Sequence, residues 1–305
     1  MYNNMQDIVD AAKSLPNRQR LVVAAAQDPD VLEAVRDAVD WGIVSAILVG
    51  DPEKIAAIAG EVGLPLEKCT VIPETDAILA ARRAVAMVAA GQGDLVMKGK
   101  IGTADILRAV LDKEKGLRTG RLLSHVTALD IQGIGRLLFM TDAAMNIAPD
   151  LGQKVQIVQN AVDVVRALGF ERPKVAALAA VELVNPDMPA AVEAALLAKM
   201  ADRGQIKGAI VDGPLALDNA ISLHSAQVKG INSPVAGHAD ILMVPDIEAG
   251  NVLYKSAVYF GRESRVAGVI AGARAPVVLT SRSDSHQAKL DSIAFSAVYA
   301  AGLKP

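Results

Sequence analysis

Two short polar segments carry the residues best suited to hold an anion. Lys98 to Thr103 (KGKIGT) follows the apolar run DLVM, and Thr280 to Ser285 (TSRSDS) follows PVVL. In the first segment, glycines let the backbone approach a ligand, and two lysines supply positive charge just before a predicted helix. The second segment offers hydroxyls, a guanidinium fork and the amino end of the last predicted helix. Both segments predict contact with a phosphate group.

Each segment also has an ordinary structural interpretation. The first can be a strand-to-helix turn with solvated lysines, and Ser283 to Ser285 can simply cap a helix. A cap does not explain Arg282, because a cation is disfavoured at the positive end of a helix unless an anion joins it. Neither segment matches the P-loop pattern, and no GxGxxG follows a predicted strand. We therefore expect the stronger anion site around Arg282.

Other catalytic chemistries find little support in the residue pattern. The histidines are scattered and show no HExxH or other metal spacing, so no metal site is predicted. His125 and His286 remain possible acid-base groups. No GxSxG elbow is present, and the single cysteine, Cys69, lies away from any glycine-rich turn, as expected of a small buried apolar residue.

Composition excludes several classes of protein. The 305 residues are 52% hydrophobic but only 3% aromatic, with 31 Lys and Arg against 34 Asp and Glu, so the net charge is −3. No apolar run approaches the roughly 18 residues of a membrane span, and no basic stripe with aromatic residues indicates nucleic-acid binding. The amino end lacks the pattern of a secretory signal, and one cysteine suits a reducing compartment. We expect a cytoplasmic globular protein.

Apolar runs alternate with helical patterns along the whole chain, which predicts an α/β fold with mostly parallel strands. Several of the runs are apolar throughout, as in sheets buried on both faces. The predicted strands are 21–26, 43–49, 94–97, 136–140, 175–180, 206–211, 240–244, 266–270 and 276–279.

Polar residues follow five of these strands directly. Ligands of open parallel sheets bind beyond the carboxyl ends of the strands, so we expect these residues to converge on one cleft. Besides Lys98 and Ser281, the set includes Asp142, Asp212, Asp246 and Glu248.

The chain is expected to form two α/β lobes. Residues 21–51 and 174–213 share one order of elements: a strand, an Asp/Asn-Pro-Asp cap, an Ala-rich helix and a strand. Any two strand-helix-strand units look similar, so the likeness alone does not establish two halves. A lone strand and helix at the carboxyl end cannot bury two faces, which favours their return to the first lobe. We assign 1–140 plus 273–305 to the first lobe and 141–272 to the second.

The carboxyl third contains two distinctive segments, SPVAGHADILMVPDIEAGNVLYKSAVYF and RAPVVLTSRSDS, and the rest of the chain holds, in order, DLVMKGKIGT, LLSHV, MTDAAMNIAPDLGQK and AIVDGPLALDNAIS. Over roughly residues 20 to 300, these segments resemble the phosphate acetyl/butyryltransferase family, and its butyryl branch most. This resemblance implies reversible transfer of a butyryl group between coenzyme A and orthophosphate, with coenzyme A as substrate and no metal or other cofactor. It also implies a doubly wound fold like that of isocitrate and isopropylmalate dehydrogenases, with an interlobe cleft, in a homodimer or larger homo-oligomer.

The resemblance also implies roles for particular residues. Ser281 and Arg282 match the Ser-Arg pair of the acetyl branch, with Arg282 on the phosphoryl group and Ser281 on the reacting sulfur or oxyanion. The acetyl branch places an aspartate base seven residues after that serine, where this chain has Ala288. We rank Asp284 first as a substitute base. The alternatives are His286 and the positive electrostatic field of Lys98 and Lys100, which would favour the thiolate. Further matches predicted to bind substrate are Lys98, Gly99, Lys100, Thr103, Ser124, His125, Asp142, Asn146, Asp212, Gly213, Asp246, Glu248, Asn251 and Lys255.

Three alternatives stay open at this point. Glu248 and Asn251 can serve only as helix caps rather than substrate contacts. The chain can prefer acetyl over butyryl groups, or it can be a non-catalytic coenzyme A-binding homologue, because Ala288 occupies the base position. A metal-dependent dehydrogenase of the same fold would need clustered aspartates and a nucleotide motif, and neither is found.

Overall fold

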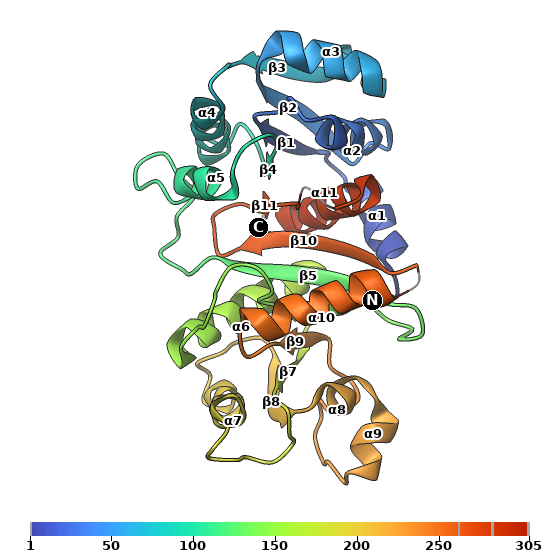
Figure 1. Cartoon of the computed structure of the whole chain (residues 1–305), viewed down its shortest axis with the longest axis vertical. Helices are drawn as coiled ribbons and strands as arrows, with labels where there is room; N and C mark the ends of the chain where they lie inside the picture. Colours follow the sequence, from blue (N-terminus) through green and yellow to red (C-terminus); the bar gives the residue numbers. More distant parts are fainter. Residues whose placement is uncertain (1, 262, 282–283, 304–305) are drawn as a thin grey trace. The chain divides into compact units, whose positions relative to one another are not determined.

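The computed structural model describes residues 2–261, 263–281 and 284–303 (Figure 1). It divides into two compact units. Unit 1 comprises Met1–Met5 and Leu122–Val266, and unit 2 comprises Gln6–Arg121 and Ala267–Pro305. Among the described residues, no helix is both long enough and apolar enough to cross a membrane.

Unit 2 holds the strands β3-β2-β1-β4-β11-β10, in this order within the eleven-stranded sheet of the chain, and helices cover them. All neighbouring strands run parallel except β10 and β11, which are antiparallel. Helix α11 packs against α2, β1, β4 and β11, and is buried over most of its length. The elements are α1 (Met5–Lys13), β1 (Gln19–Ala24), α2 (Pro29–Asp40), β2 (Val44–Gly50), α3 (Pro52–Val62), η1 (Leu66–Lys68), β3 (Cys69–Pro73), α4 (Ala77–Ala89), β4 (Leu95–Lys98), α5 (Thr103–Val110), β10 (Arg265–Ala271), β11 (Val277–Val278) and α11 (His286–Gly302).

Unit 1 holds five strands in the order β5-β6-β9-β7-β8. Strands β5 and β6 are antiparallel, and the other neighbours are parallel. The elements are β5 (Ser124–Asp130), β6 (Leu138–Thr141), α6 (Leu151–Ala167), β7 (Lys174–Leu178), α7 (Pro189–Asp202), β8 (Ile210–Leu215), α8 (Leu217–Ile221), α9 (Leu223–Val228), β9 (Ile241–Met243) and α10 (Ile247–Phe260).

The sequence sets helix starts at the carboxyl ends of the strands. Asp28 caps α2 by accepting a hydrogen bond from Val31 N, and Pro29 occupies the first turn. Ser285 caps α11 by accepting from Ala288 N at 3.2 Å. These caps satisfy amide groups that the first turn of a helix leaves unpaired. They therefore fix where the chain leaves the sheet and turns into a helix.

The nine predicted strands are all present, with bounds shifted by a few residues, and α5 begins at Thr103 as predicted. Two strands were missed, β3 and β5. The mostly parallel pairing is confirmed, except at the β5–β6 and β10–β11 pairs.

The boundaries of the units differ from the expected lobes. Residues 122–140 belong to unit 1 because β6 pairs with both β5 and β9. Residues 267–272 belong to unit 2, where Ile270 of β10 pairs with Val277 of β11. Within unit 2, β11 pairs with β4 and α11 packs against α2.

Candidate active site

Unit 2 contains a cavity of about 250 Å³ at the carboxyl ends of β1 and β4. Lys98 is the last residue of β4 and pairs in register with Ala24, the last residue of β1. Strand β11 runs parallel to β4 on its other side. The cavity is lined by Asp28, Pro29, Asp30, Val31, Lys98, Gly99, Thr280, Ser281 and Lys289. Lys98, Gly99 and Ser281, predicted from two separate segments, thus share one cavity.

Gly99 closes the cavity floor against the turn that follows β1. Gly99 N donates to Ala24 O at 2.9 Å, and Lys100 N donates to Ala25 O at 2.7 Å. A Cβ on Gly99 would stand 2.2 Å from Ala25 O, far inside van der Waals contact. Ala25 itself has φ of +54°, a conformation that costs a non-glycine residue energy. Glycine is therefore required where β4 passes this turn.

Hydrogen bonds link Ser281, Asp284 and Lys289. Asp284 Oδ2 accepts from Ser281 N at 2.7 Å, and Ser281 O accepts from Asp284 N at 3.2 Å. Lys289 Nζ donates to Asp284 O at 2.5 Å and lies 3.4 Å from Asp30 Oδ2 on α2. Lys289 therefore ties Asp284 to α11 and to the start of α2.

Two buried cations give the cavity its electrostatic character. Lys98 is 8% exposed and Lys289 is 3% exposed. Lys98 Nζ donates to Gly99 O at 3.3 Å, and the carboxylate of Asp30, the partner of Lys289, is largely exposed. An ammonium group removed from water interacts strongly with a nearby charge, since the local dielectric constant is low. Asp28, the cap of α2, and Asp30 also line the cavity, so its two ammonium groups face two carboxylates.

Lys100, Thr103 and His286, predicted in or next to these segments, take other positions. Lys100 and Thr103 are exposed and follow Gly99 along the chain, outside the cavity lining given by the described residues. Arg282 lies outside the described residues. His286 Nε2 is 2.9 Å from Asp37 Oδ2 on α2.

In unit 1, Asp142 and Asn146 form a local hydrogen-bonded cluster just after β6. Asp142 is 2% exposed, and its Oδ1 accepts from Ala144 N and Met145 N at 2.9 Å each. Asn146 Nδ2 donates to Asp142 Oδ2 at 2.6 Å and to Leu123 O at 2.9 Å. These bonds order the turn, and contact of either side chain with substrate stays a prediction.

Ser124 and His125 are buried on β5. Ser124 Oγ accepts from Asn160 Nδ2 at 2.9 Å, and His125 Nδ1 lies 3.2 Å from Thr127 Oγ1. Thr141 Oγ1 donates to His125 O at 2.8 Å. Both predicted residues therefore have structural partners within unit 1.

The remaining predicted residues lie on β8 and α10 of unit 1. Asp212 is half-buried on β8, and its Oδ1 accepts from Gly213 N at 2.8 Å. A Cβ on Gly213 would stand 2.7 Å from Ala177 O on β7, so β8 and β7 approach closely there.

On α10, Asp246 is the amino-terminal cap and accepts from Ala249 N at 2.8 Å. Asn251 Nδ2 donates to Ala143 O at 3.3 Å, which links α10 to the Asp142 turn. Glu248 is exposed and Lys255 is half-buried on the same helix. Asn251 thus contacts the turn after β6 rather than capping α10, whose cap is Asp246.

Sequence reasoning missed Lys289, Asp28 and Asp30 as cavity residues. The available signal was a lysine next to the long apolar stretch of α11, because a buried lysine requires a partner. The half-buried Cys69 takes no part in this cavity, and burial, with smaller contributions from Glu67 and Asp40, raises the pKa of its thiol to about 11. Among the described residues, no group of three or more His, Cys, Asp or Glu could hold a metal ion.

Known proteins resemble this chain along its whole length. Residues 4–81 and 74–297 match the family described as "Phosphate acetyl/butaryl transferase". The chain is 49% identical to the phosphate butyryltransferase of Clostridium acetobutylicum over 300 residues, covering 98% of this chain and 99% of the relative. It is 46% identical to the phosphate acetyltransferase of Thermotoga maritima, covering 97% and 99%.

Solved structures agree with this relationship. A branched-chain phosphotransacylase from Enterococcus faecalis superposes with a TM-score of 0.82 at 35% identity, covering 92% of this chain and 99% of that one. A 4-hydroxythreonine-4-phosphate dehydrogenase from Klebsiella pneumoniae shares the fold alone, with a TM-score of 0.60 at 13% identity. The dehydrogenase-like α/β architecture is thus confirmed, and the chain belongs to the phosphate acetyl/butyryltransferase family of acyltransferases.

Proposed function

We propose that this chain transfers a butyryl group reversibly between coenzyme A and orthophosphate: butyryl-CoA plus phosphate gives butyryl phosphate plus coenzyme A. The observation that carries the proposal is the cavity of about 250 Å³ in which the buried ammonium groups of Lys98 and Lys289 accompany Ser281. Identities of 48 to 49% to two phosphate butyryltransferases and a probable third support the butyryl group as the substrate.

The proposed reaction needs phosphate held still beside a thioester carbonyl. A phosphate oxygen attacks the carbonyl carbon, a C–O bond forms, and the tetrahedral oxyanion collapses with cleavage of the C–S bond. The sulfur leaves as a thiolate and takes up a proton. Lys98 and Lys289 orient the phosphate by charge, and positive groups at the reacting centre stabilise the developing oxyanion. Ser281 and Arg282 are assigned to the oxyanion or sulfur and to the phosphoryl group.

The reverse direction requires deprotonation of the coenzyme A thiol. A thiol with an ordinary pKa of about 8.5 needs only modest assistance near neutral pH. We assign this role to Asp284, whose carboxylate is fixed next to Ser281 by the bond from Ser281 N. The alternative is that Asp284 only holds the backbone at Ser281. A comparison of the Asp284→Asn and Asp284→Ala variants separates this structural role from the role of a base.

Phosphate acetyltransferase activity is the second candidate, favoured by the 46% identity to the Thermotoga maritima enzyme. The two activities differ in the acyl chain accepted. Release of coenzyme A from acetyl-, propionyl-, butyryl- and hexanoyl-CoA in the presence of phosphate ranks the chains by kcat/KM. A maximum at butyryl-CoA supports the proposal, whereas a maximum at acetyl-CoA replaces it with the acetyl activity.

Substitution of Arg282 tests the transferase chemistry itself. Arg282→Ala should lower kcat/KM with phosphate about 30-fold, since loss of a charge-assisted contact costs about 2 kcal/mol. Arg203→Ala, at an exposed position after α7, is the matched control and should match the wild type. Unchanged turnover in Arg282→Ala removes Arg282 from the reaction. Tight coenzyme A binding by a wild-type chain with no turnover would instead indicate a non-catalytic homologue.

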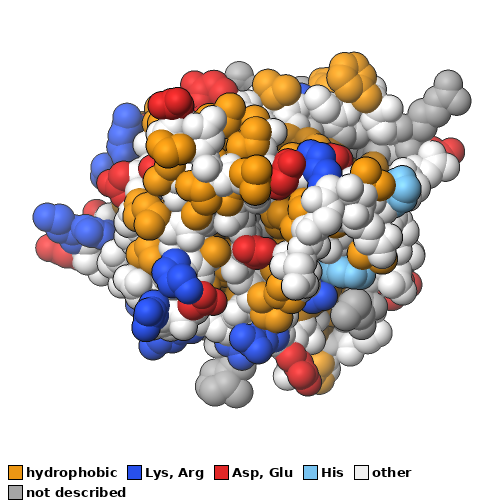
Figure 2. Space-filling view, turned by 90° about the horizontal axis from the view of Figure 1, so that it is seen from below, with side chains coloured by type: hydrophobic (Ala, Val, Ile, Leu, Met, Phe, Trp, Pro, Cys, Tyr) orange, Lys and Arg blue, Asp and Glu red, His pale blue; other side chains and the backbone are white. Residues whose placement is uncertain are grey.

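The proposal includes a homo-oligomer that works in the cytoplasm with coenzyme A as substrate and without a metal. Exposed apolar side chains of α10 support self-association, with Val252 at 66%, Tyr259 at 71% and Phe260 at 84% exposure. Figure 2 shows hydrophobic side chains exposed among charged ones across one face. Light scattering on the purified chain measures the mass, and a monomer at assay concentration overturns this part.

A further inference from the structure

Unit 1 contains a cavity of about 640 Å³ that none of the predicted catalytic or substrate-binding residues lines. Its lining comes from the amino ends of three adjacent parallel strands. Arg136 precedes β6, Lys174 begins β7, and Asp240 precedes β9. The predicted substrate residues of unit 1 follow the opposite, carboxyl ends of strands, as Asp142 does after β6. The volume falls in the range typical of sites for small organic ligands.

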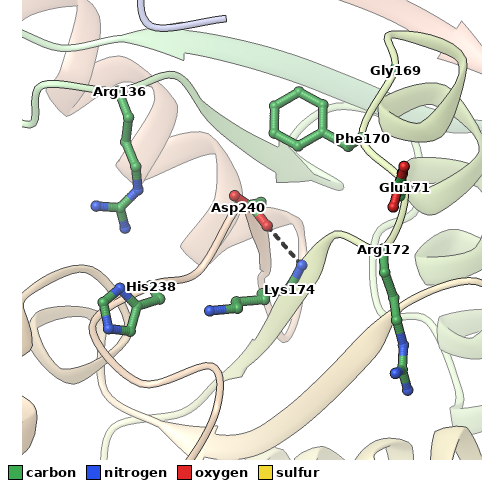
Figure 3. A pocket seen from close by; sticks show the side chains of 8 residues that line it. All are labelled: Arg136, Gly169, Phe170, Glu171, Arg172, Lys174, His238 and Asp240. Atoms are coloured by element: carbon green, nitrogen blue, oxygen red, sulfur yellow. Dashed lines mark hydrogen bonds between the residues drawn. The ribbon is translucent and has the colours of Figure 1, made fainter. Parts of the chain in front are cut away.

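Cationic side chains converge in this cavity. In Figure 3, Arg136, Lys174 and His238 point toward a common space beside Asp240, while Arg172 extends away from it. Arg136 Nη2 donates to Ala239 O at 3.1 Å, which fixes the guanidinium at the cavity wall. Its Nε is buried and has no hydrogen-bond partner among the described residues. A buried donor without a hydrogen-bond partner costs free energy. An acceptor atom of a ligand would supply the hydrogen bond that Arg136 Nε lacks.

Asp240 offsets only part of this positive charge. Its Oδ2 accepts from Lys174 N at 2.8 Å, so the carboxylate is engaged with the backbone of β7. Burial raises the pKa of Asp240, and this outweighs the lowering by the Lys174 N–H bond and by the nearby Arg136 and Lys174 charges. Counted over all the charged residues that line the cavity, the three cations Arg136, Arg172 and Lys174 and the two carboxylates Glu171 and Asp240 leave one net positive charge.

We propose that this cavity binds a phosphate-bearing anion larger than orthophosphate, with Arg136 and Lys174 holding the phosphate and His238 at its edge. Guanidinium and ammonium groups together provide fork-like and point-charge contacts suited to phosphate oxygens. The remaining volume, bounded by Phe170 and the loop before β7, accommodates a second phosphate or an organic group. The rival explanation is that the cations merely offset the negative carboxyl end of α6, which terminates just before Gly169.

Histidine-ring NMR of the full chain tests the proposal at the cavity itself. The chain has four histidines, and His238→Gln assigns the His238 signal. Pyrophosphate and adenosine diphosphate are titrated separately, with orthophosphate as the small reference anion. We expect a saturable shift of the His238 signal with pyrophosphate or adenosine diphosphate, and weaker binding of orthophosphate. Preference for adenosine diphosphate indicates an organic phosphate ester, and preference for pyrophosphate indicates a free inorganic anion.

A double variant and a matched control make the test decisive. Arg136→Gln with Lys174→Gln should weaken the affinity seen at His238 by about 10-fold or more, the effect of losing charged contacts. Lys199→Gln, at an exposed position on α7, should leave it unchanged. The transferase turnover of the double variant shows whether it folds. A rate within about twofold of wild type is on the order of the ordinary scatter between folded variants and confirms folding. The proposal is overturned if the His238 signal does not shift on titration, or if it shifts equally in the double variant and the wild type.

Discussion

Gly99 and Ala25 meet so closely that a Cβ on Gly99 would stand 2.2 Å from Ala25 O, while Lys100 N donates to that same oxygen at 2.7 Å. The contact joins the ends of β1 and β4 at the floor of the unit 2 cavity. It fixes the backbone on either side of Gly99, and with it the position from which Lys98 enters the cavity. The shape of this cavity therefore depends on a residue with no side chain.

Replacing Gly99 by alanine should damage both stability and turnover. Because the obstructing atom is backbone, either β4 or the turn at Ala25 must shift, at a cost of about 2 kcal/mol. Urea unfolding and steady-state kinetics measure the two effects. Gly60→Ala in α3 is the control, since open space surrounds that position and alanine favours a helix by about 0.5–1 kcal/mol. A Gly99→Ala variant as stable and active as wild type would contradict the tight packing.

Removing the charge of Lys289 should weaken phosphate binding more than it affects folding. Methionine matches the apolar stem of lysine up to Cε but lacks the ammonium group that donates to Asp284 O and faces the cavity. We expect the KM for phosphate to rise about 10-fold or more in Lys289→Met. Lys54→Met, at an exposed position on α3, should leave the KM unchanged. A normal KM for phosphate in Lys289→Met would place the anion elsewhere.

The two roles of Asp284 separate in its Asn and Ala variants. Asparagine keeps an oxygen that can accept from Ser281 N, whereas alanine loses that bond. If Asp284 is the base, Asp284→Asn slows the reaction that consumes coenzyme A most below neutral pH, where thiolate is scarce. A pH–rate profile of the two variants distinguishes the role of a base from a positioning role. A defect confined to the alanine variant would assign Asp284 a positioning role only.

Cys69 should react slowly with alkylating reagents. With its pKa raised to about 11, mainly by burial, only about one thiol in a thousand is ionised at pH 8. The rate of iodoacetamide modification should therefore rise with pH throughout the mildly alkaline range and increase sharply on unfolding in urea. Mass spectrometry follows the single site. Modification as fast as that of free cysteine at pH 8 would show that the thiol is not shielded.

Asp240 should make the stability of the protein fall as pH rises. Because burial raises its pKa in the folded state above the unfolded value, the folded protein binds this proton more tightly. The unfolding free energy contributed by this group is highest at acidic pH and decreases as pH rises from about 4 through the raised pKa. Asp240→Asn removes that slope and keeps an acceptor for Lys174 N. Urea titrations of both proteins across this range measure it, and parallel pH curves would refute the assignment.

The apolar runs of the sequence revealed most of the sheet, but they concealed β5. Ser124, His125 and Thr127 make that segment look half-exposed, yet all three are buried and have polar partners. Burial of polar residues through local hydrogen bonds cannot be read from periodicity. The antiparallel direction of β5 beside β6 was hidden for the same reason, because a missed strand leaves no pairing to consider.

The sequence pattern selected the cavity residues that follow a strand and missed those at the start of a helix. Lys98, Gly99 and Ser281 come directly after apolar strands and share one cavity. Lys289 lies in the first turn of α11, where tertiary packing alone aims it at the cavity. Asp142 was selected by the same rule as Lys98, but the structure gives it backbone partners of its own.

The division of unit 2 into two stretches of chain has a consequence for biosynthesis. Residues up to Arg121 leave the ribosome long before β11 arrives to lie beside β4, and all of unit 1 beyond its first five residues is translated in between. Until then the nascent polypeptide carries an unpaired β4 edge and an uncovered face awaiting α11, both open to misassociation. The unit 2 cavity is completed only when α11 has been made, because Lys289 of that helix lines it.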